Sequence, residues 1–480
     1  MSLTNPQNRQ SQSQPRNDQT HLITLKCKSL ILSLWAPSLL ILILSLSLAK
    51  FTPILHYLKP NLLWSPGRAQ PSSAHLRPPC VLWMAPFLSP GGYSSEAWSY
   101  ITSLSSFTKT HNFSLKILPH GDSNSFEFFN GLPEKSKNLA YELYNADCEL
   151  SESIVVCHSE PGAWFPPLFQ TLPCPPTGYQ EPLFVVGRTM FETDRINPNH
   201  VERCNRMDKI WVPSEFHVSM FVDNGVDESK VAKLVQPVDV EFFDPSKYQA
   251  FALESIKPVV GSRCGDNKDF VFLSVFKWEQ RKGWDVLLKA FLSEFSRSDC
   301  VSLYLLVSAY HSDTKFGAKI SNFVKQTGLV PPADGWAGVH VINVHVAQSD
   351  LPRLYKAADA FVLPTRGEGW GRPIVEAMAM ALPVIATNWS GPTEYLTEEN
   401  GYPLPIDEMS EVSDGPFVGH KWAEPSSERL RVLMRRVVSD REEGRRRGRR
   451  AREDMMKRFS PEVVGRILAD EILGIVRMLG

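Results

Sequence analysis

Two carboxylates, Glu368 and Glu376, stand eight residues apart around a turn that is rich in glycine. Pro373 suits the first position of a helix, so we expect Glu376 in the first turn of that helix. Each carboxylate can accept two hydroxyl hydrogen bonds, which suits one of them to a transferred hexose and the other to a ribose at the same cleft mouth. The N–H groups that would face an anion before the helix are those of Gly369, Trp370 and Gly371.

Two lysines occupy the first loop of the same predicted domain. Lys277 closes an apolar run, and Lys282 stands where the next helix is expected to begin. A cation at a helix N-terminus opposes the helix dipole, so the placement is reasonable if both ammonium groups share an anion. Solvated loop lysines are the ordinary alternative. Together with the glycine-rich turn, the pair indicates a diphosphate site.

A resemblance to a known family rests on the segment Gly-Glu-Gly-Trp-Gly-Arg-Pro-Ile-Val-Glu-Ala, followed by Pro-Val-Ile-Ala-Thr and Ser-Gly-Pro-Thr-Glu. It resembles the retaining family-four glycosyltransferases of the GT-B fold, the glycosyl transferases group 1, over about residues 80–478. The resemblance implies transfer of a hexose from a nucleotide-diphosphate sugar with retention of configuration. It also implies that Glu368, Lys277 and Lys282 are catalytic, with both lysines on the departing diphosphate.

Three departures from the family pattern matter. Lys277 stands where the family usually has arginine, which keeps the charge but loses a bidentate fork. Ala381 occupies a position that is commonly glycine, which we interpret as a packing change. The acceptor-side histidine of many relatives has no clear counterpart. Glu192, in the aligned stretch, and His158, after a different strand, are the acceptor-side candidates, although His158 is better explained by a structural role.

The first loop of the N-terminal half contains the adjacent glycines Gly91 and Gly92. They could let the backbone approach a donor phosphate, and a tight turn explains them equally well. No Asp-x-Asp triplet occurs in the sequence, so protein cations are expected to replace a divalent metal. No cofactor is expected, and the nucleotide sugar is a co-substrate.

The elements that position these residues are short apolar runs separated by helix-length amphipathic stretches, typical of parallel sheets. The first set of predicted strands is 81–85, 115–118, 154–157, 183–186, 210–212 and 231–235. The second set is 270–275, 302–307, 339–344, 360–363 and 384–386. We therefore predict an α/β protein with two Rossmann-like domains facing a cleft and an N-terminal membrane segment. The domains are residues 79–245 on the acceptor side, a linker 246–268, a nucleotide-sugar domain 269–459 and a crossover helix 460–480.

The N-terminus begins with a polar tail, residues 1–28. The segment Ser29–Ala49 contains 21 residues without charge, long enough for a transmembrane signal anchor. A cleaved signal peptide and an organelle transit segment are the alternatives. Residues 50–78 resemble a Pro/Ser-rich stem. Basic residues before the span predict a single-pass protein with a lumenal catalytic part, in the Golgi or endoplasmic reticulum.

Composition is that of an ordinary globular protein, with 43% hydrophobic and 21% charged residues, and a net charge of -1 does not suggest a nucleic-acid partner. The eight cysteines show no zinc-ligand spacing and are core residues or occasional disulfides. The arginine-rich stretch 441–452 is expected to be a solvated helix. The expected partners are a nucleotide sugar and a glycan, lipid or protein acceptor.

Two other functions are compatible with this fold. One is a scaffold or binding protein that has lost catalysis, and the other is a phosphorylase with a pyridoxal cofactor. The phosphorylase is disfavoured because its long insertions are missing from this sequence. The presence of Glu368, Glu376, Lys277 and Lys282 favours the active transferase.

Overall fold

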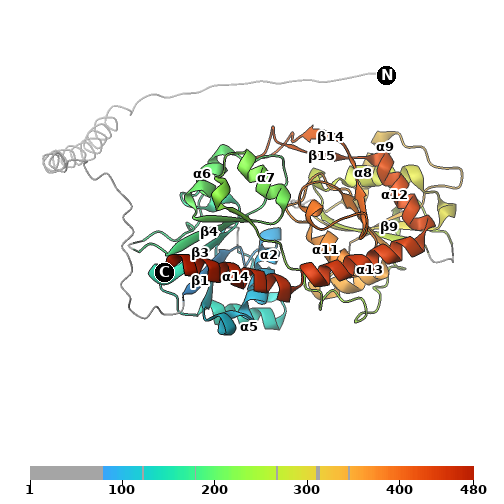
Figure 1. Cartoon of the computed structure of the whole chain (residues 1–480). Coiled ribbons are helices and arrows are strands. Elements are labelled where there is room, and N and C mark those ends of the chain that lie inside the picture. The colour runs from blue at the N-terminus through green and yellow to red at the C-terminus, as the bar shows by residue number, and fades with distance from the viewer. Residues whose placement is uncertain (1–78, 122–123, 179, 266–268, 310–313, 344–345) are drawn as a thin grey trace, which may run out of the picture. The chain divides into compact units, whose positions relative to one another are not determined.

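The structure is a computed structural model that describes residues 79–121, 124–178, 180–265, 269–309, 314–343 and 346–480. The predicted tail 1–28, apolar segment Ser29–Ala49 and stem 50–78 lie outside these residues. The described residues form two mainly parallel sheets with helices packed against them (Figure 1). This arrangement confirms the predicted α/β class with two Rossmann-like domains.

The N-terminal sheet has the strand order β2-β1-β3-β4-β5-β6, and all its pairs are parallel. Its strands are β1 (Cys80–Ala85), β2 (Ser114–Pro119), β3 (Ser153–His158), β4 (Phe184–Arg188), β5 (Lys209–Val212) and β6 (Val231–Lys233). Strands β1 and β3 are buried along their whole length, as expected for parallel strands covered by helices. The strand order reverses between β1 and β3, the switch point of this sheet.

The helices of the N-terminal domain are α2 (Gly92–Ser105), α3 (Thr108–His111), α4 (Phe126–Asn130), α5 (Glu134–Tyr144), α6 (Pro198–Arg206) and α7 (Glu215–Asp223). The last helix of the chain, α14 (Pro461–Leu479), also packs on this domain, against α2. At Gly465 the approach is so close that an added Cβ would lie 3.0 Å from the Ser103 carbonyl oxygen. The C-terminal end of the chain thus contributes to the core of the first domain.

The C-terminal sheet has the order β13-β12-β11-β8-β9-β10-β7. Its strands are β7 (Pro258–Val260), β8 (Phe270–Lys277), β9 (Val301–Ser308), β10 (Gly338–Ile342), β11 (Ala360–Leu363), β12 (Val384–Thr387) and β13 (Tyr402–Leu404). Strand β7, antiparallel to β10, lies within residues 246–268, which the sequence predicts to be a linker. A three-residue edge strand that starts with proline is too short to show strand periodicity, so it escapes sequence analysis.

The helices of the C-terminal domain are α8 (Trp284–Glu294), α9 (Phe316–Thr327), α10 (Leu351–Ala357), α11 (Arg372–Ala379), α12 (Ser427–Ser439) and α13 (Arg441–Arg458). A hairpin of β14 (Ile406–Glu411) and β15 (Lys421–Pro425) precedes α12. The sequence analysis does not predict this hairpin. Its importance lies in its contacts with the other domain, described below.

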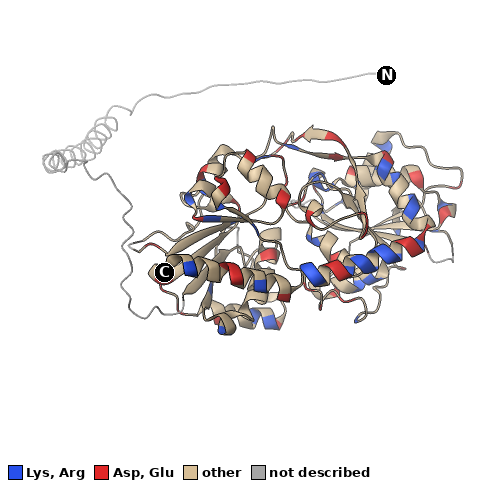
Figure 2. Cartoon of the chain, viewed as in Figure 1, with Lys and Arg blue, Asp and Glu red and all other residues tan. Residues whose placement is uncertain are grey.

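Helix α13 contains the arginine-rich stretch, and in Figure 2 its ribbon carries both the blue of basic residues and the red of acidic residues. Acidic neighbours on the same helix pair with several of the arginines. Arg445 lies 3.4 Å from Glu442 and Arg450 lies 3.9 Å from Glu453, and each of these four side chains is more than half exposed. Interleaved pairs of this kind are typical of a solvated helix.

Six of the cysteines in the described part of the chain form disulfides, which the sequence allowed without indicating the partners. The pairs are Cys80–Cys148, Cys157–Cys174 and Cys264–Cys300. Cys204 is a buried free thiol, and burial raises its pKa. Pairing depends on which loops the sheets bring together, and spacing in the chain does not reveal it.

Ala381 has a left-handed backbone with φ of 59°, so the family's glycine at this position serves conformation rather than packing. The backbone cannot easily relax here, because α13 approaches closely: a Cβ on Gly448 would lie 2.2 Å from the Ala381 carbonyl oxygen. We expect Ala381→Gly to raise the free energy of unfolding by about 0.5–1 kcal/mol, measured by urea denaturation. Ala357→Gly, within helix α10, should instead lower it. A loss of stability in Ala381→Gly would contradict the strain.

Candidate functional site

The C-terminal sheet reverses its strand order between β8 and β11, which are parallel neighbours. The loops that leave the carboxyl ends of these strands therefore start side by side, where ligands of such sheets bind. The loop after β8 contains Lys282, and the loop after β11 contains Glu368 and the glycine-rich turn. Topology thus brings together groups that are 86 residues apart in the chain.

Lys282 and Glu368 form an ion pair at this point. The Lys282 Nζ lies 2.7 Å from Oε1 and 2.9 Å from Oε2 of Glu368. Only 12% of the lysine side chain and 7% of the glutamate side chain are exposed. Burial alone would raise the pKa of Glu368, but Lys282 and Arg281 hold it below its usual value. The site therefore presents an ionised carboxylate and a cation in one fixed geometry.

Arg281 is a further cation of the site, which sequence analysis missed. Its guanidinium donates to the Gly367 carbonyl oxygen at 2.6 Å and to Glu279 at 3.0 Å. It also lies 3.5 Å from Glu368 and 3.7 Å from Glu192, a residue of the N-terminal domain. Arg281 thus connects the two domains beside the ion pair. Its only signal in the sequence is the basic run Gln-Arg-Lys, which a solvated loop explains as well.

The glycine-rich turn is buried against the N-terminal domain. An added Cβ on Gly367 would lie 2.1 Å from the Glu192 carbonyl oxygen, and one on Gly369 would lie 2.6 Å from the Met190 sulfur. Gly371 has a left-handed φ of 94° and immediately precedes α11. Gly367 is therefore required by close contact with the backbone of the other domain, whereas a larger residue at Gly369 would displace the Met190 side chain. The sequence does not reveal either contact.

The predicted anion-binding N–H groups stand at the start of α11. Within the described residues, no acceptor is hydrogen-bonded to the N–H groups of Gly369, Trp370 and Gly371. The Trp370 carbonyl oxygen, in contrast, accepts from the Tyr395 hydroxyl at 2.5 Å. The turn is thus fixed, and its N–H groups, although buried, have no acceptor within the described part of the chain.

Glu376 belongs to a separate set of contacts. Helix α11 begins at Arg372, so Glu376 is its fifth residue and lies in the second turn, not in the predicted first turn. The Tyr355 hydroxyl donates to its Oε2 at 3.0 Å, and the Arg372 Nε lies 3.8 Å from Oε1. Burial raises the pKa of Glu376, against the opposing effects of Arg372 and Tyr355. Its described partners do not include Glu368.

Lys277 is the last residue of β8, and its side chain is exposed. It therefore stands at the carboxyl edge of the strand whose loop contains Lys282. The predicted lysine pair thus shares one loop, but the two side chains differ in burial. Lys282 is fixed by Glu368, whereas Lys277 is at the surface.

In the N-terminal domain, Gly91 and Gly92 are exposed at the start of α2, at the carboxyl end of β1. The Tyr93 hydroxyl donates to the Met190 carbonyl oxygen at 3.0 Å and lies 3.1 Å from the Thr189 hydroxyl. Met190 in turn contacts the glycine-rich turn. The glycine pair is therefore linked to the donor-side loops through the loop that follows β4.

His158 lies in the interior of the N-terminal domain and is 0% exposed. Its Nε2 is 2.9 Å from Glu96, and its Nδ1 accepts from the Trp83 indole at 3.1 Å. Glu96 also pairs with Arg188, which is equally buried. Burial lowers the pKa of His158. Because both ring nitrogens have buried partners and no part of the ring reaches the surface, the structure favours the structural role for His158 over the acceptor-side role.

Glu192 is the remaining acceptor-side candidate, and 36% of its side chain is exposed. Burial raises its pKa, and Arg281 opposes this effect. The hairpin β14–β15 and the residue before β15 form hydrogen bonds to the residues that follow Glu192 in the chain. The Lys421 N–H donates to Asp194 at 2.7 Å, and the Thr193 hydroxyl lies 2.9 Å from His420 Nδ1.

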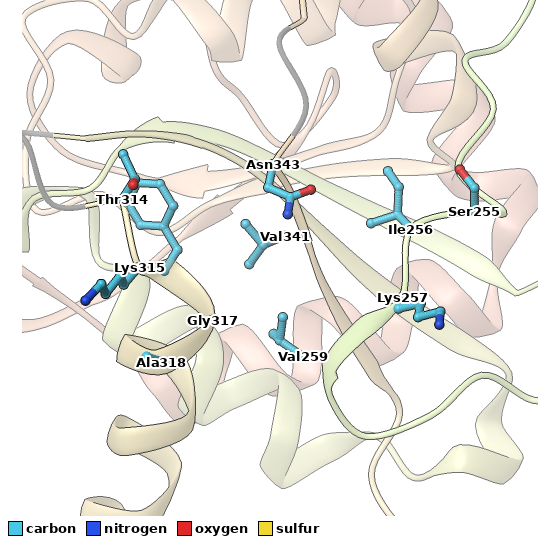
Figure 3. Close-up of a pocket in the computed structure, with 11 residues that line it drawn as sticks. Ser255, Ile256, Lys257, Val259, Thr314, Lys315, Gly317, Ala318, Val341 and Asn343 are labelled. Carbon is cyan, nitrogen blue, oxygen red and sulfur yellow. The ribbon is translucent and has the colours of Figure 1, made fainter.

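The C-terminal domain contains a cavity of about 360 Å³. Figure 3 shows residues that line it. Val259 of β7, Val341 of β10 and Gly317 of α9 line it. None of the predicted site residues lies among its lining residues. The cavity is therefore distinct from the loops after β8 and β11.

Residues 267–414 match the family described as Glycosyl transferases group 1. The C-terminal domain is therefore a group 1 glycosyltransferase domain, which confirms the family predicted from the glycine-rich turn. The mannosylfructose-phosphate synthase of Agrobacterium fabrum is 32% identical over 124 residues, which are 25% of this chain and 26% of that enzyme. The O-antigen chain mannosyltransferase B of Escherichia coli is 50% identical over 44 residues, 9% of this chain and 12% of that protein. Both alignments thus span about a quarter or less of the relative.

Solved structures share the fold over a larger part of the chain. The sucrose-phosphate synthase of Thermosynechococcus elongatus has a TM-score of 0.56 at 14% identity, covering 83% of this chain and 100% of that one. The Anabaena protein HepE, in complex with UDP and glucose, has a TM-score of 0.53 at 14% identity, covering 82% and 100%. At these identities the likeness shows the fold alone, and that fold is GT-B.

The predicted lumenal localisation in the Golgi or endoplasmic reticulum is wrong. The curated relatives include bacterial glycosyltransferases of Agrobacterium fabrum and Rhizobium meliloti, which are not lumenal enzymes of those organelles. The part of the chain that the structure describes contains no helix that is both long and apolar enough to cross a membrane. The predicted anchor, Ser29–Ala49, lies outside that part.

Proposed function

We propose that this protein transfers a hexose from a nucleotide-diphosphate sugar to a hydroxyl acceptor, with retention of configuration and without a metal. The observation that supports this most directly is the buried pair of Lys282 and Glu368 at the switch point of the C-terminal sheet. In this assignment Glu368 binds hydroxyls of the hexose, and Lys282 faces the diphosphate. Glu376, with its own partner Tyr355, is assigned to the ribose.

The reaction breaks the bond between the anomeric carbon and a diphosphate oxygen, and the electron pair leaves with the nucleoside diphosphate. Negative charge therefore grows on the leaving group, and in this assignment Lys277, Lys282 and the N–H groups before α11 stabilise it. The acceptor oxygen forms the new bond to the anomeric carbon, and its proton passes to a base on the acceptor side. Glu192, whose raised pKa makes it a stronger base once ionised, is the proposed residue on the acceptor side.

The donor class follows from the chemistry of the site and from the names of similar proteins. The similar structure of HepE is a complex with UDP and glucose. Two of the curated relatives are named as mannosyltransferases. We therefore expect the protein to release nucleoside diphosphate from at least one of UDP-glucose, UDP-N-acetylglucosamine and GDP-mannose. A coupled assay of that release, with Glu368→Gln as the blank, is the test. No release from any of the three donors, with no binding of UDP or GDP, would favour the inactive scaffold.

We expect turnover to be unchanged in EDTA, because the proposed mechanism assigns lysines and backbone N–H groups to the leaving diphosphate and the sequence contains no Asp-x-Asp triplet. The measurement is the initial rate of nucleoside diphosphate release before and after chelation and dialysis. Loss of the rate in EDTA, followed by recovery with Mn²⁺, would contradict the metal-free mechanism. That result would leave the transferase assignment intact.

A further inference from the structure

Ser390 has a backbone conformation that is normally left to glycine. Its φ is 58° and its ψ is -140°. It stands between β12 and the short helix Gly391–Glu394, and it is 0% exposed. A side chain is strained in this region, and such strain tends to persist where it serves a site.

The turn at Ser390 and Gly391 forms hydrogen bonds with both the N–H group and the carbonyl oxygen of Glu368. The Glu368 N–H donates to the Ser390 hydroxyl oxygen at 3.0 Å, and the Gly391 N–H donates to the Glu368 carbonyl oxygen at 3.0 Å. Gly391 makes this approach possible, since an added Cβ would lie 2.8 Å from the Glu368 carbonyl oxygen. The peptide groups of Glu368 are therefore fixed independently of its carboxylate, which Lys282 binds.

Ser390 is itself held in place. Its carbonyl oxygen accepts from the Thr393 N–H at 3.1 Å and from the Thr393 hydroxyl at 2.7 Å. The preceding residue, Trp389, packs edge-on against Phe216 of the N-terminal domain at 5.1 Å between ring centroids. The hydroxyl that Glu368 contacts thus belongs to a rigid turn between the two domains.

We propose that Ser390 is a positioning residue, whose hydroxyl sets Glu368 in the geometry that transfer of the hexose requires. The inference rests on the proposed function of Glu368. Ser390 contacts the backbone of Glu368 and acts through that residue. A displacement of about 1 Å at a reacting group can cost about a hundredfold in rate, so a single hydrogen bond to the backbone is enough to matter.

Two substitutions separate this role from a merely structural one. Ser390→Ala and Ser390→Gly both remove the hydroxyl, but only glycine relieves the backbone strain. We expect Ser390→Gly to melt at a higher temperature than Ser390→Ala. Nevertheless, we expect both variants to lower kcat by about 10- to 100-fold with the donor KM unchanged. The substrate is whichever of UDP-glucose, UDP-N-acetylglucosamine and GDP-mannose gives the fastest release of nucleoside diphosphate.

Ala381→Gly is the matched control. It also relieves the backbone strain of a left-handed residue in the same domain, but at a position that does not contact Glu368, so kcat should be unchanged. If Ser390→Gly has the wild-type kcat while Glu368→Gln is inactive, the inference fails and the proposed function stands. If Glu368→Gln is fully active, the proposed function fails.

A crystal structure of Ser390→Gly supplies a readout that needs no turnover. Separation of the Glu368 carboxylate from Lys282 would support the positioning role even if no donor is turned over. An ion pair that stays at the wild-type distances would overturn it.

Discussion

Lys282→Ala is expected to lower kcat/KM by roughly 10²–10³-fold, the cost of removing one preorganised charge from the leaving group. The substitution also leaves Glu368 buried with Arg281 as its nearest described cation, at 3.5 Å. Since Lys282 helps to hold the pKa of Glu368 down, that pKa should rise in the variant. The acid limb of the pH profile of turnover should therefore move to higher pH. Affinity for UDP and GDP, measured by calorimetry, should fall together with turnover.

Lys289→Ala is the control for this prediction. Lys289 is an exposed lysine on α8, so its removal changes the charge of the same domain without touching the site. It should leave turnover and nucleotide affinity unchanged. Wild-type affinity in Lys282→Ala would show that Lys282 serves only to hold Glu368.

Glu96→Ala is expected to destabilise the protein by about 3–5 kcal/mol, because it leaves the buried Arg188 without its carboxylate. Both side chains are 0% exposed. Although burial disfavours the charged form, Arg188 and His158 lower the pKa of Glu96 to about 2. Arg188 also donates to the Leu234 carbonyl oxygen at 3.0 Å, so it cannot leave the interior without breaking further contacts. The measurement is urea unfolding followed by fluorescence.

A surface pair of the same residue types provides the comparison. Arg206 and Glu202 lie 2.7 Å apart on α6, with 49% and 56% of their side chains exposed. Glu202→Ala should cost less than about 1 kcal/mol, because solvent screens the pair. Equal losses in Glu96→Ala and Glu202→Ala would show that Arg188 finds another partner or reaches solvent.

The sequence alone determined the order of the main strands and helices and the loops in which the candidate residues lie. Apolar runs and helical periodicity are local features, so the strands can be predicted from the sequence. Because ligands bind beyond the carboxyl ends of parallel strands, the predicted strand ends indicate which loops form the site. For this reason Lys282 and Glu368 could be assigned to one site before their contact was known. The family was recognisable because its glycine-rich turn is a continuous segment.

Only the tertiary structure decided which groups touch. Gly367 is needed because the backbone of another domain lies against it, and Arg281 matters because Glu192 and Glu368 approach it from distant loops. The burial of His158 has the same cause, since a residue at the end of a strand is exposed or enclosed according to the helices packed over it. These contacts join residues far apart in the chain, and pairing across such distances depends on packing, which local spacing does not encode.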